Sequence, residues 1–368
     1  MGVYCDEYIS SNSITNEKTR IAVAISARNE ETVIESCIYS IKNQKPQNMD
    51  YDIFLIADNC SDNTVPICKN LGVFCITKSD GKQTGKIGAI NELFSYIKDH
   101  DDYDGILLLD ADDILDNNVF SELEKEISRK RSDIIQLRIT PNKNKKKLTI
   151  SEKVKTLHYA AITMRSQGAF ARGLFWETDQ HGIFYSSKII MSEFLWYTSK
   201  FQFDFQWAIR LLLLDFKFSY INRAIVFTEV NKNIKTEIKQ NFRWSVYKSQ
   251  LRIFLLPLFK KWGLTKRKII LFASWEIIKL PNLALILLIF ANFIIGLYLK
   301  LYFIVIISLI LFFLLQVFIS QIIIWNNLSF SLLYSYIILP FYSILRLFFE
   351  FYYIIKTKGN SMGFEKKR

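Results

Sequence analysis

The stretch "ILLLDADDIL", residues 106–115, joins an apolar run to three carboxylates within four positions. Continuous runs of Ile and Leu that end in turn residues are typical of strands covered on both faces of a parallel sheet. Asp110, Asp112 and Asp113 follow directly, and carboxylates are rarely buried without a partner because their desolvation is costly. The stretch therefore predicts a buried strand whose end meets a compensating positive group.

Short strand-like runs alternate with helical patterns through the first 115 residues. Helical spacing occurs at 29–44 and 62–72, and Gly72 at the end of the second is a suitable helix C-cap. Strands are predicted at 21–26, 52–58, 73–77 and 105–110. This alternation predicts an α/β fold with right-handed crossovers, built on a doubly wound, mostly parallel sheet.

Polar residues gather after three of these strands. The first strand runs into Glu30, the second into Asp58, and the fourth into Asp110 and Asp112. Ligands of such sheets bind outside the carboxyl ends of the strands. Turns and helix N-caps also favour Asn, Asp and Ser, so each group by itself has a structural alternative. Their coincidence at three strand ends indicates one shared site.

The C-terminal part of the chain is far more apolar than the rest. Half of the 368 residues are hydrophobic, and they concentrate in residues 281–355. A buried core helix is the alternative for any one apolar segment, but three in succession favour C-terminal membrane helices. Each is near the about 20 residues that cross a bilayer: they are 282–299, 302–325 and 328–355.

The net charge of +12 has two interpretations. Basic clusters at 260–268 and 356–368 flank the apolar region, where Lys and Arg meet anionic headgroups and mark the cytoplasmic side. Nucleic acid is the alternative partner, and the flanking positions favour the membrane surface instead. The polar first 20 residues contain no signal peptide, and the five cysteines lack zinc-type spacing. These features predict a globular part in a reducing cytoplasm.

Five motifs, taken in order, resemble the inverting family 2 glycosyltransferases and, within them, the membrane-integrated polysaccharide synthases. They are "ARNEE" (27–31), "ADNCSDNT" (57–64), "TGKIGAIN" (84–91), "DAD" (110–112) and "QNFRW" (240–244). The resemblance runs from about Ile21 to Trp244. It implies a nucleotide-sugar-binding glycosyltransferase A-type fold and a hexosyltransferase whose donor is a nucleotide-diphosphate hexose, expected to be UDP-linked.

The resemblance also implies which residues bind the donor. Asp110 would lie close to the nucleotide and sugar, and with Asp112 it would hold Mg²⁺ or Mn²⁺, the missing positive partner of the carboxylates. Asp58 would bind the base, and Lys86 would place its ammonium near the diphosphate. Asp113 has no counterpart and is interpreted as a turn or cap residue.

The ribose and base are expected to be gripped by Glu30 or Glu31. The acceptor side is less regular, and only Gly182 is retained where synthases carry a Gly-rich acceptor loop. The preceding residue, His181, could equally belong to the acceptor loop or have a structural role. Alignment places Asp204 at the general base that takes the proton from the acceptor hydroxyl, with a helix cap as its alternative.

The resemblance implies that the last motif contacts both the diphosphate and the acceptor. Arg243 would meet the diphosphate, and Trp244, with Gln240, would bind the acceptor sugar. An amphipathic interfacial helix is the alternative for this stretch. The implied function is metal-assisted transfer of a hexose, with inversion, to a growing polysaccharide at the membrane. Single-sugar transfer to a polyprenyl phosphate carrier and a catalytically inactive membrane scaffold are the alternatives.

The implied partners are the nucleotide-sugar donor, a polysaccharide or lipid-linked acceptor, the lipid bilayer and other membrane components of an export system. The protein is expected to be a multi-pass protein of the inner membrane, with its catalytic domain in the cytoplasm. The predicted layout is a polar segment (1–20), a cytoplasmic glycosyltransferase domain (21–245), an amphipathic interfacial region (246–280), a membrane region (281–355) and a basic tail (356–368).

Overall fold

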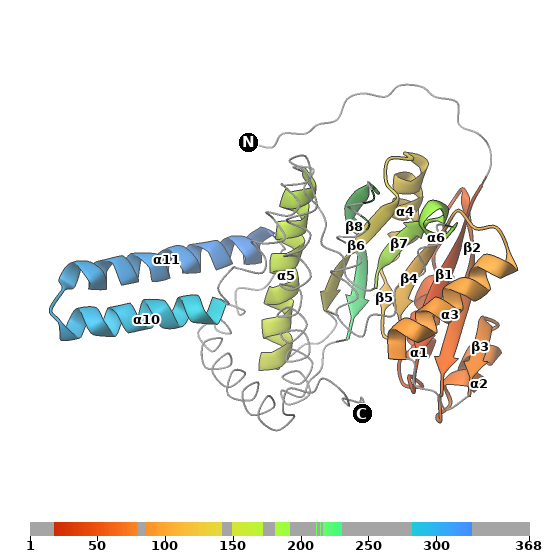
Figure 1. The fold of residues 1–368 in the computed structure, drawn as a ribbon, viewed down its shortest axis with the longest axis horizontal. Coiled ribbons are helices and arrows are strands. Elements are labelled where there is room, and N and C mark those ends of the chain that lie inside the picture. The colour runs from red at the N-terminus through yellow and green to blue at the C-terminus, as the bar shows by residue number, and fades with distance from the viewer. Residues whose placement is uncertain are drawn as a thin grey trace.

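The computed structural model describes residues 18–79, 85–141, 149–171, 181–191, 211, 214, 216–229 and 282–325. This part of the chain forms a sheet with helices on both faces, beside a projecting helical hairpin (Figure 1). The strands are β1 (Thr19–Ala27), β2 (Met49–Asp58), β3 (Phe74–Lys78), β4 (Gly105–Asp110), β5 (Ile114–Leu115), β6 (Ile134–Pro141), β7 (Ile183–Ser186) and β8 (Phe218–Thr228). The helices are α1 (Ile34–Lys42), α2 (Thr64–Asn70), α3 (Gly85–His100), α4 (Val119–Ser128), α5 (Ile150–Ala171), α6 (Ser187–Met191), α10 (Asn282–Tyr298) and α11 (Tyr302–Trp325).

The eight strands form one mixed sheet in the order β3-β2-β1-β4-β7-β6-β8-β5. β1 is parallel to β2 and β4, and β2 is parallel to β3, so the four predicted strands and their direction are confirmed. β7 is antiparallel to both β4 and β6, and β5 is antiparallel to β8. The prediction of a mostly parallel sheet is correct for the first half, whereas the second half is mixed, because β6 is parallel to β8 while the other pairings there are antiparallel. An apolar run does not encode strand direction.

Helices cover both faces of the sheet, as predicted. Ile21, Val23 and Ile25 of β1 pack into the core that also contains buried residues of α1, α2 and α4. Ala22 and Ala24 pack on the opposite face, into the core built with α3 and α6. All five residues are completely buried. Burial on both faces explains why this strand is continuously apolar in the sequence.

Gly72 ends α2 as predicted. Its φ is +65°, and its N–H donates to the carbonyl of Lys69 at 3.0 Å, while the N–H of Val73 donates to the carbonyl of Cys68 at 3.3 Å. This pair of bonds is a Schellman motif, which favours glycine because side chains strain a positive φ. The motif turns the chain directly into β3.

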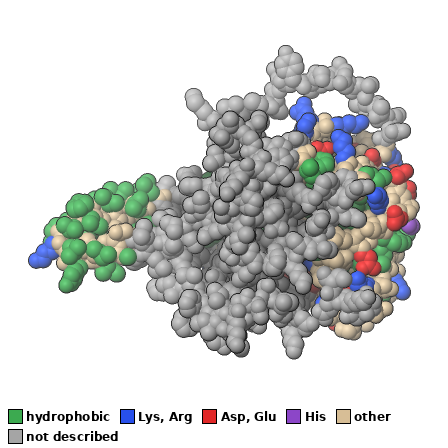
Figure 2. All heavy atoms as spheres, in the orientation of Figure 1, with side chains coloured by type: hydrophobic (Ala, Val, Ile, Leu, Met, Phe, Trp, Pro, Cys, Tyr) green, Lys and Arg blue, Asp and Glu red, His purple; other side chains and the backbone are tan. Residues whose placement is uncertain are grey.

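α10 and α11 form a hairpin that packs through α11 against α5, and α5 packs against β6 and β8 (Figure 1). The two helices approach closely at Gly296, where an added Cβ would lie 3.0 Å from Val305 Cγ2. Large apolar side chains cover the outside of the hairpin (Figure 2), and Tyr298 and Phe313 are 85% and 65% exposed.

The first two predicted apolar segments coincide with α10 and α11, so their helical structure is confirmed. Among the residues that the structure describes, however, no helix is both long and apolar enough to cross a membrane. The expected transmembrane helices are therefore not found there. The third segment, 328–355, lies outside the described residues.

Candidate functional site

The carboxyl ends of β1, β2 and β4 meet at one edge of the sheet. Ser26 of β1 is in register with Ile56 of β2 on one side and with Asp110 of β4 on the other. Asp58 ends β2 two residues beyond Ile56. The parallel register therefore brings the predicted strand ends together.

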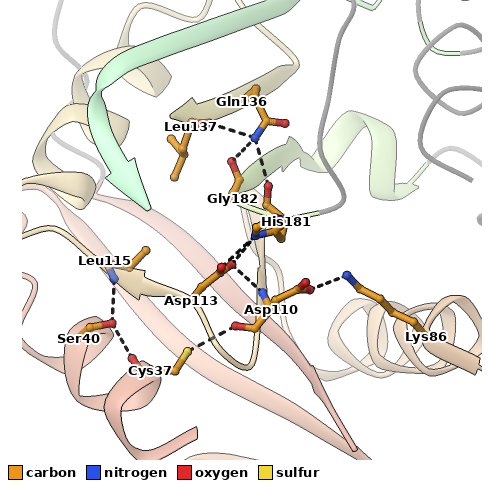
Figure 3. A network of polar contacts seen from close by, with 10 residues as sticks. All are labelled: Cys37, Ser40, Lys86, Asp110, Asp113, Leu115, Gln136, Leu137, His181 and Gly182. Atoms are coloured by element: carbon orange, nitrogen blue, oxygen red, sulfur yellow. Dashed lines mark hydrogen bonds and ion pairs between the residues drawn. The ribbon is translucent and has the colours of Figure 1, made fainter. Parts of the chain in front are cut away.

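Asp110 begins a tight turn that is closed in both directions. The N–H of Asp113 donates to the carbonyl of Asp110 at 3.1 Å, and the N–H of Asp110 donates to Asp113 Oδ2 at 2.9 Å. The Cys37 thiol donates to the same Asp110 carbonyl at 3.6 Å. Lys86 Nζ, from the first turn of α3, donates to Asp110 Oδ1 at 2.5 Å (Figure 3). The main chain and one carboxylate oxygen of Asp110 are thus held in place.

The carboxylate of Asp112 is less well compensated than those of Asp110 and Asp113. Burial raises the pKa of its carboxyl to about 6, and the negative charges of Asp110 and Asp113 act in the same direction. No hydrogen bond from a described residue opposes this shift, although the more distant charge of His181 lowers it. Asp112 is therefore the carboxylate of this turn whose charge is least compensated by the described part of the chain.

The residues present fit a hard divalent cation that is shared with a phosphate ligand. Mg²⁺ takes oxygen ligands and is usually held by one or two carboxylates, with phosphate oxygens and waters in the other positions. Asp110 and Asp112 are two such carboxylates, and the excess negative charge at Asp112 suits a cation. Within the described ranges, no group of three or more His, Cys, Asp or Glu side chains is placed to hold a metal by itself.

The third carboxylate, Asp113, is completely buried and pairs with a histidine. Both of its oxygens lie 2.9 Å from His181 Nδ1. Burial alone would lower the pKa of His181, but the charges of Asp113 and Asp110 and the hydrogen bond to Asp113 raise it to about 10. The pairing thus favours the cationic form of the ring, while burial raises the pKa of the Asp113 carboxyl that faces it. The interpretation of Asp113 as a turn residue is correct, because its N–H and its carboxylate close the turn at Asp110. The ion pair of the same carboxylate with His181 was not predicted.

The two glutamates after β1 occupy different environments. Glu30 is 8% exposed, and its negative charge contributes to the raised pKa of Asp112. Glu31 Oε2 instead accepts hydrogen bonds from the backbone and side-chain N–H groups of Asn63, both at 2.9 Å. Glu31 thus ties two loops together, and Glu30 is the glutamate on the Asp112 side. Asp58 is 4% exposed and accepts a hydrogen bond from Asn59 Nδ2 at 2.9 Å.

Comparison with known proteins identifies this half of the chain. Residues 22–195 match the sequence profile of the family described as "Glycosyl transferase family 2". The matched segment covers just under half of the chain and is similar to family 2 glycosyltransferase domains. No curated protein matches the chain.

Solved structures of glycosyltransferases align with part of this chain at low sequence identity. S. aureus TarS 1-349 aligns with a TM-score of 0.43 and 11% identity, over 57% of this chain and 60% of that one. The mannosyltransferase PcManGT from Pyrobaculum calidifontis, in complex with GDP-Man and Mn²⁺, aligns with a TM-score of 0.49 and 12% identity, over 71% of this chain and 70% of that one. The chain thus spans less than two thirds of TarS 1-349.

The family 2 domain contains all the predicted donor and metal residues that the structure describes: Glu30, Asp58, Lys86, Asp110 and Asp112. The register of β1, β2 and β4 places Asp58 and Asp110 at one edge of the sheet, and the roles of all five residues stay predictions. The remaining predicted residues lie outside both the matched segment and the described residues. They are Asp204, Gln240, Arg243 and Trp244.

Sequence reasoning missed the pairing of Asp113 with His181, which are 68 residues apart. Two signals were available in the family 2 domain. A third carboxylate at the end of a buried strand needs its own partner, and His181 is followed by a glycine, Gly182, which has a φ of +58° just before β7. Neither signal identifies the partner without the register of β4 and β7.

Proposed function

We propose that this protein transfers a hexose from a nucleotide-diphosphate sugar, UDP-linked, to a growing polysaccharide at the membrane, with inversion of the anomeric centre. The observation that carries the proposal is the Asp110–Asp112 pair beside Lys86, at the carboxyl edge of a family 2 glycosyltransferase domain. An under-compensated carboxylate, next to a carboxylate that pairs with the ammonium of Lys86, suits a ligand that combines a cation with phosphates.

The described residues divide the work of donor binding. Asp58, buried at the end of β2, would accept a hydrogen bond from the base, and Glu30 would bind the ribose on the Asp112 side. Lys86 would turn from Asp110 toward the diphosphate, as a point charge on a flexible stem. Asp110 and Asp112 would hold the divalent cation. When bound, that cation would neutralise charge on the diphosphate leaving group.

Inversion needs a single displacement and therefore a base for the acceptor hydroxyl. We assign this role to Asp204, whose neighbours Phe203, Phe205 and Trp207 are apolar. A base that removes the proton during attack typically contributes roughly 10²–10⁴-fold in rate. Asp204→Asn should therefore lower sugar transfer by at least about 100-fold while nucleotide binding stays within a few-fold of the parent. Transfer that survives in a folded variant would assign Asp204 to a helix cap.

Extension of a polymer is the part of the proposal that rests on Gln240, Arg243 and Trp244. Arg243 would contact the diphosphate, and Trp244 and Gln240 would bind the acceptor sugar. Trp244→Ala should impair elongation and leave donor binding nearly intact, whereas Arg243→Ala should impair every reaction of the donor. Products that never exceed one added sugar on a polyprenyl phosphate would favour the lipid-carrier alternative.

Membrane attachment is supported by the hairpin of α10 and α11. Its exposed apolar side chains would be costly in water at about 25 cal/mol per Å² of apolar surface, and insertion into lipid would remove that cost. At its tip, Lys300 stands between Tyr298 and Tyr302, residue types that favour membrane interfaces. We place the domain on the cytoplasmic side of the inner membrane, where nucleotide sugars are made, together with other components of an export system.

The test is a donor screen on purified membranes that contain the full chain, with released nucleotide and product length as readouts. One nucleotide hexose should be turned over, a chelator should abolish turnover, and Mn²⁺ or Mg²⁺ should restore it. Full turnover in excess chelator would contradict the cation assignment. The absence of turnover with every nucleotide hexose would favour the inactive scaffold.

A further inference from the structure

The segment before β7 continues the β4 ladder through side chains instead of backbone bonds. The antiparallel ladder pairs Gly105 with Ser186 and ends where Leu108 pairs with Ile183. Continued at the same register, it would place Asp110 opposite His181. The N–H of Asp110 donates instead to Asp113, and Asp113 in turn holds the ring of His181 (Figure 3). The ion pair thus replaces the backbone bond that the ladder lacks at this step.

The backbone of His181 is fixed from the other side by β6. Gln136 Nε2 donates to the carbonyls of His181 at 3.1 Å and Gly182 at 3.0 Å, and the N–H of Leu137 donates to the Gly182 carbonyl at 2.8 Å. A side chain at Gly182 would be strained, because its φ is +58° and an added Cβ, 2.7 Å from Ile139 Cδ1, would force that atom to shift. The backbone that carries the His181 ring is therefore held by β6. A continuous series of hydrogen bonds runs from β6 through His181 and Asp113 to Asp110.

A buried ion pair is a costly way to obtain stability. Apolar residues of similar volume are often as stabilising or more so, since both charges must be taken out of water. The side chains of Asp113 and His181 are 0% and 12% exposed, so this cost applies to them. We therefore attribute the pair to the contact that it makes with the rest of the site. That contact is the hydrogen bond from the backbone N–H of Asp110 to the Asp113 carboxylate.

We propose that Asp113 and His181 are positioning residues for the cation site, which fix the Asp110–Asp113 turn so that the carboxylates of Asp110 and Asp112 share one ligand. The inference rests on the proposed function for the identity of that ligand. Neither residue needs to touch the cation. Side chains that orient metal ligands typically change metal affinity by about 10–100-fold when they are replaced.

The experiment is a cycle of three variants of the full chain in detergent: Asp113→Leu, His181→Phe and the double variant. Mn²⁺ affinity is measured by electron paramagnetic resonance, with and without UDP, and thermal stability is measured beside it. His100→Gln is the matched control, because His100 packs on Phe54 and Phe74 at another part of the sheet. Its Mn²⁺ affinity should equal that of the parent.

Each single variant leaves one buried partner alone and should be less stable, whereas the double variant removes both charges and should regain stability. Mn²⁺ affinity should fall by about 10–100-fold in all three variants, and the losses should not add. A merely structural pair predicts instead that affinity recovers together with stability in the double variant. That result, or parental Mn²⁺ affinity in the single variants, would overturn the inference.

The outcomes separate this inference from the proposed function. If the parent binds Mn²⁺ and UDP but transfers no sugar, the proposed function fails, and the variants still decide the role of the pair. If the parent transfers sugar and the variants bind Mn²⁺ as the parent does, only the positioning role fails. If the parent binds no Mn²⁺ with or without UDP, the cation site and its positioning residues are both wrong.

Discussion

Carboxylates gather at both ends of the same sheet, and their hydrogen-bond and ion-pair partners differ between the two ends. At the amino end, Arg20 donates to Asp52 at 2.9 Å and to Asp101, and its guanidinium lies 4.9 Å from the ring centre of Tyr103. Tyr103 also donates its hydroxyl to Asp52 at 2.8 Å. Bonds from the backbone of Asp102 and from Arg20 hold the pKa of Asp101 below its usual range.

At the carboxyl end the compensation is incomplete. Asp110 has Lys86 and Asp113 has His181, but the pKa of Asp112 is raised to about 6. At the amino end, Asp52 and Asp101 both accept hydrogen bonds from the chain itself, which is what a structural clasp requires. The carboxyl end keeps unbalanced negative charge where a ligand is expected. The comparison indicates that compensation, and not the number of carboxylates, distinguishes a binding site from a clasp.

The largest expected effect comes from exchanging one carboxylate at each end for its amide. Asp112→Asn should lower donor turnover by at least roughly 100-fold even at saturating Mn²⁺, because a metal ligand is lost. Asp52→Asn, the matched control, should lower the melting temperature and leave turnover of the folded protein within about two-fold, since surface changes far from a site act independently. Equal losses of turnover in both variants would remove the distinction between the two ends.

A change in pH should affect the carboxyl end first. A carboxyl with a pKa of about 6 holds a proton below that value. Because Mn²⁺ must displace this proton, its affinity should fall about ten-fold per pH unit below about pH 6 and stay level above it. Titrations of Mn²⁺ between about pH 5 and 8 test this, with circular dichroism as the check on folding. Affinity independent of pH across this window would contradict the assignment of Asp112.

The smallest effect is expected from Tyr103→Phe at the amino end. It removes the hydroxyl that donates to Asp52 and keeps the ring beneath Arg20. The net loss of one hydrogen bond should lower the free energy of unfolding by about 0.5–1.5 kcal/mol. Thermal unfolding measures this loss, and turnover at a permissive temperature should be unchanged. A turnover defect here would show that the clasp influences the distant site.

Much of the first half of the fold was predictable from sequence because its signals are local. Burial on both faces requires continuous apolar strands, so β1, β2 and β4 are visible as runs of Ile, Leu, Val and Ala. Glycine at a positive φ marks the end of α2. Polar residues that follow such strands must lie at one edge, which is why Asp58, Asp110 and Asp112 were identified together.

The direction of β7 and the partner of Asp113 were decided only by the tertiary structure. β7 is four residues long and joins β4 and β6 in antiparallel register, a choice that depends on packing between distant segments. That register alone brings His181 opposite Asp110 and next to Asp113. A sequence shows that a buried carboxylate needs a positive partner, because desolvation is a local cost. It does not show which cation arrives, because that depends on how strands far apart in the chain align.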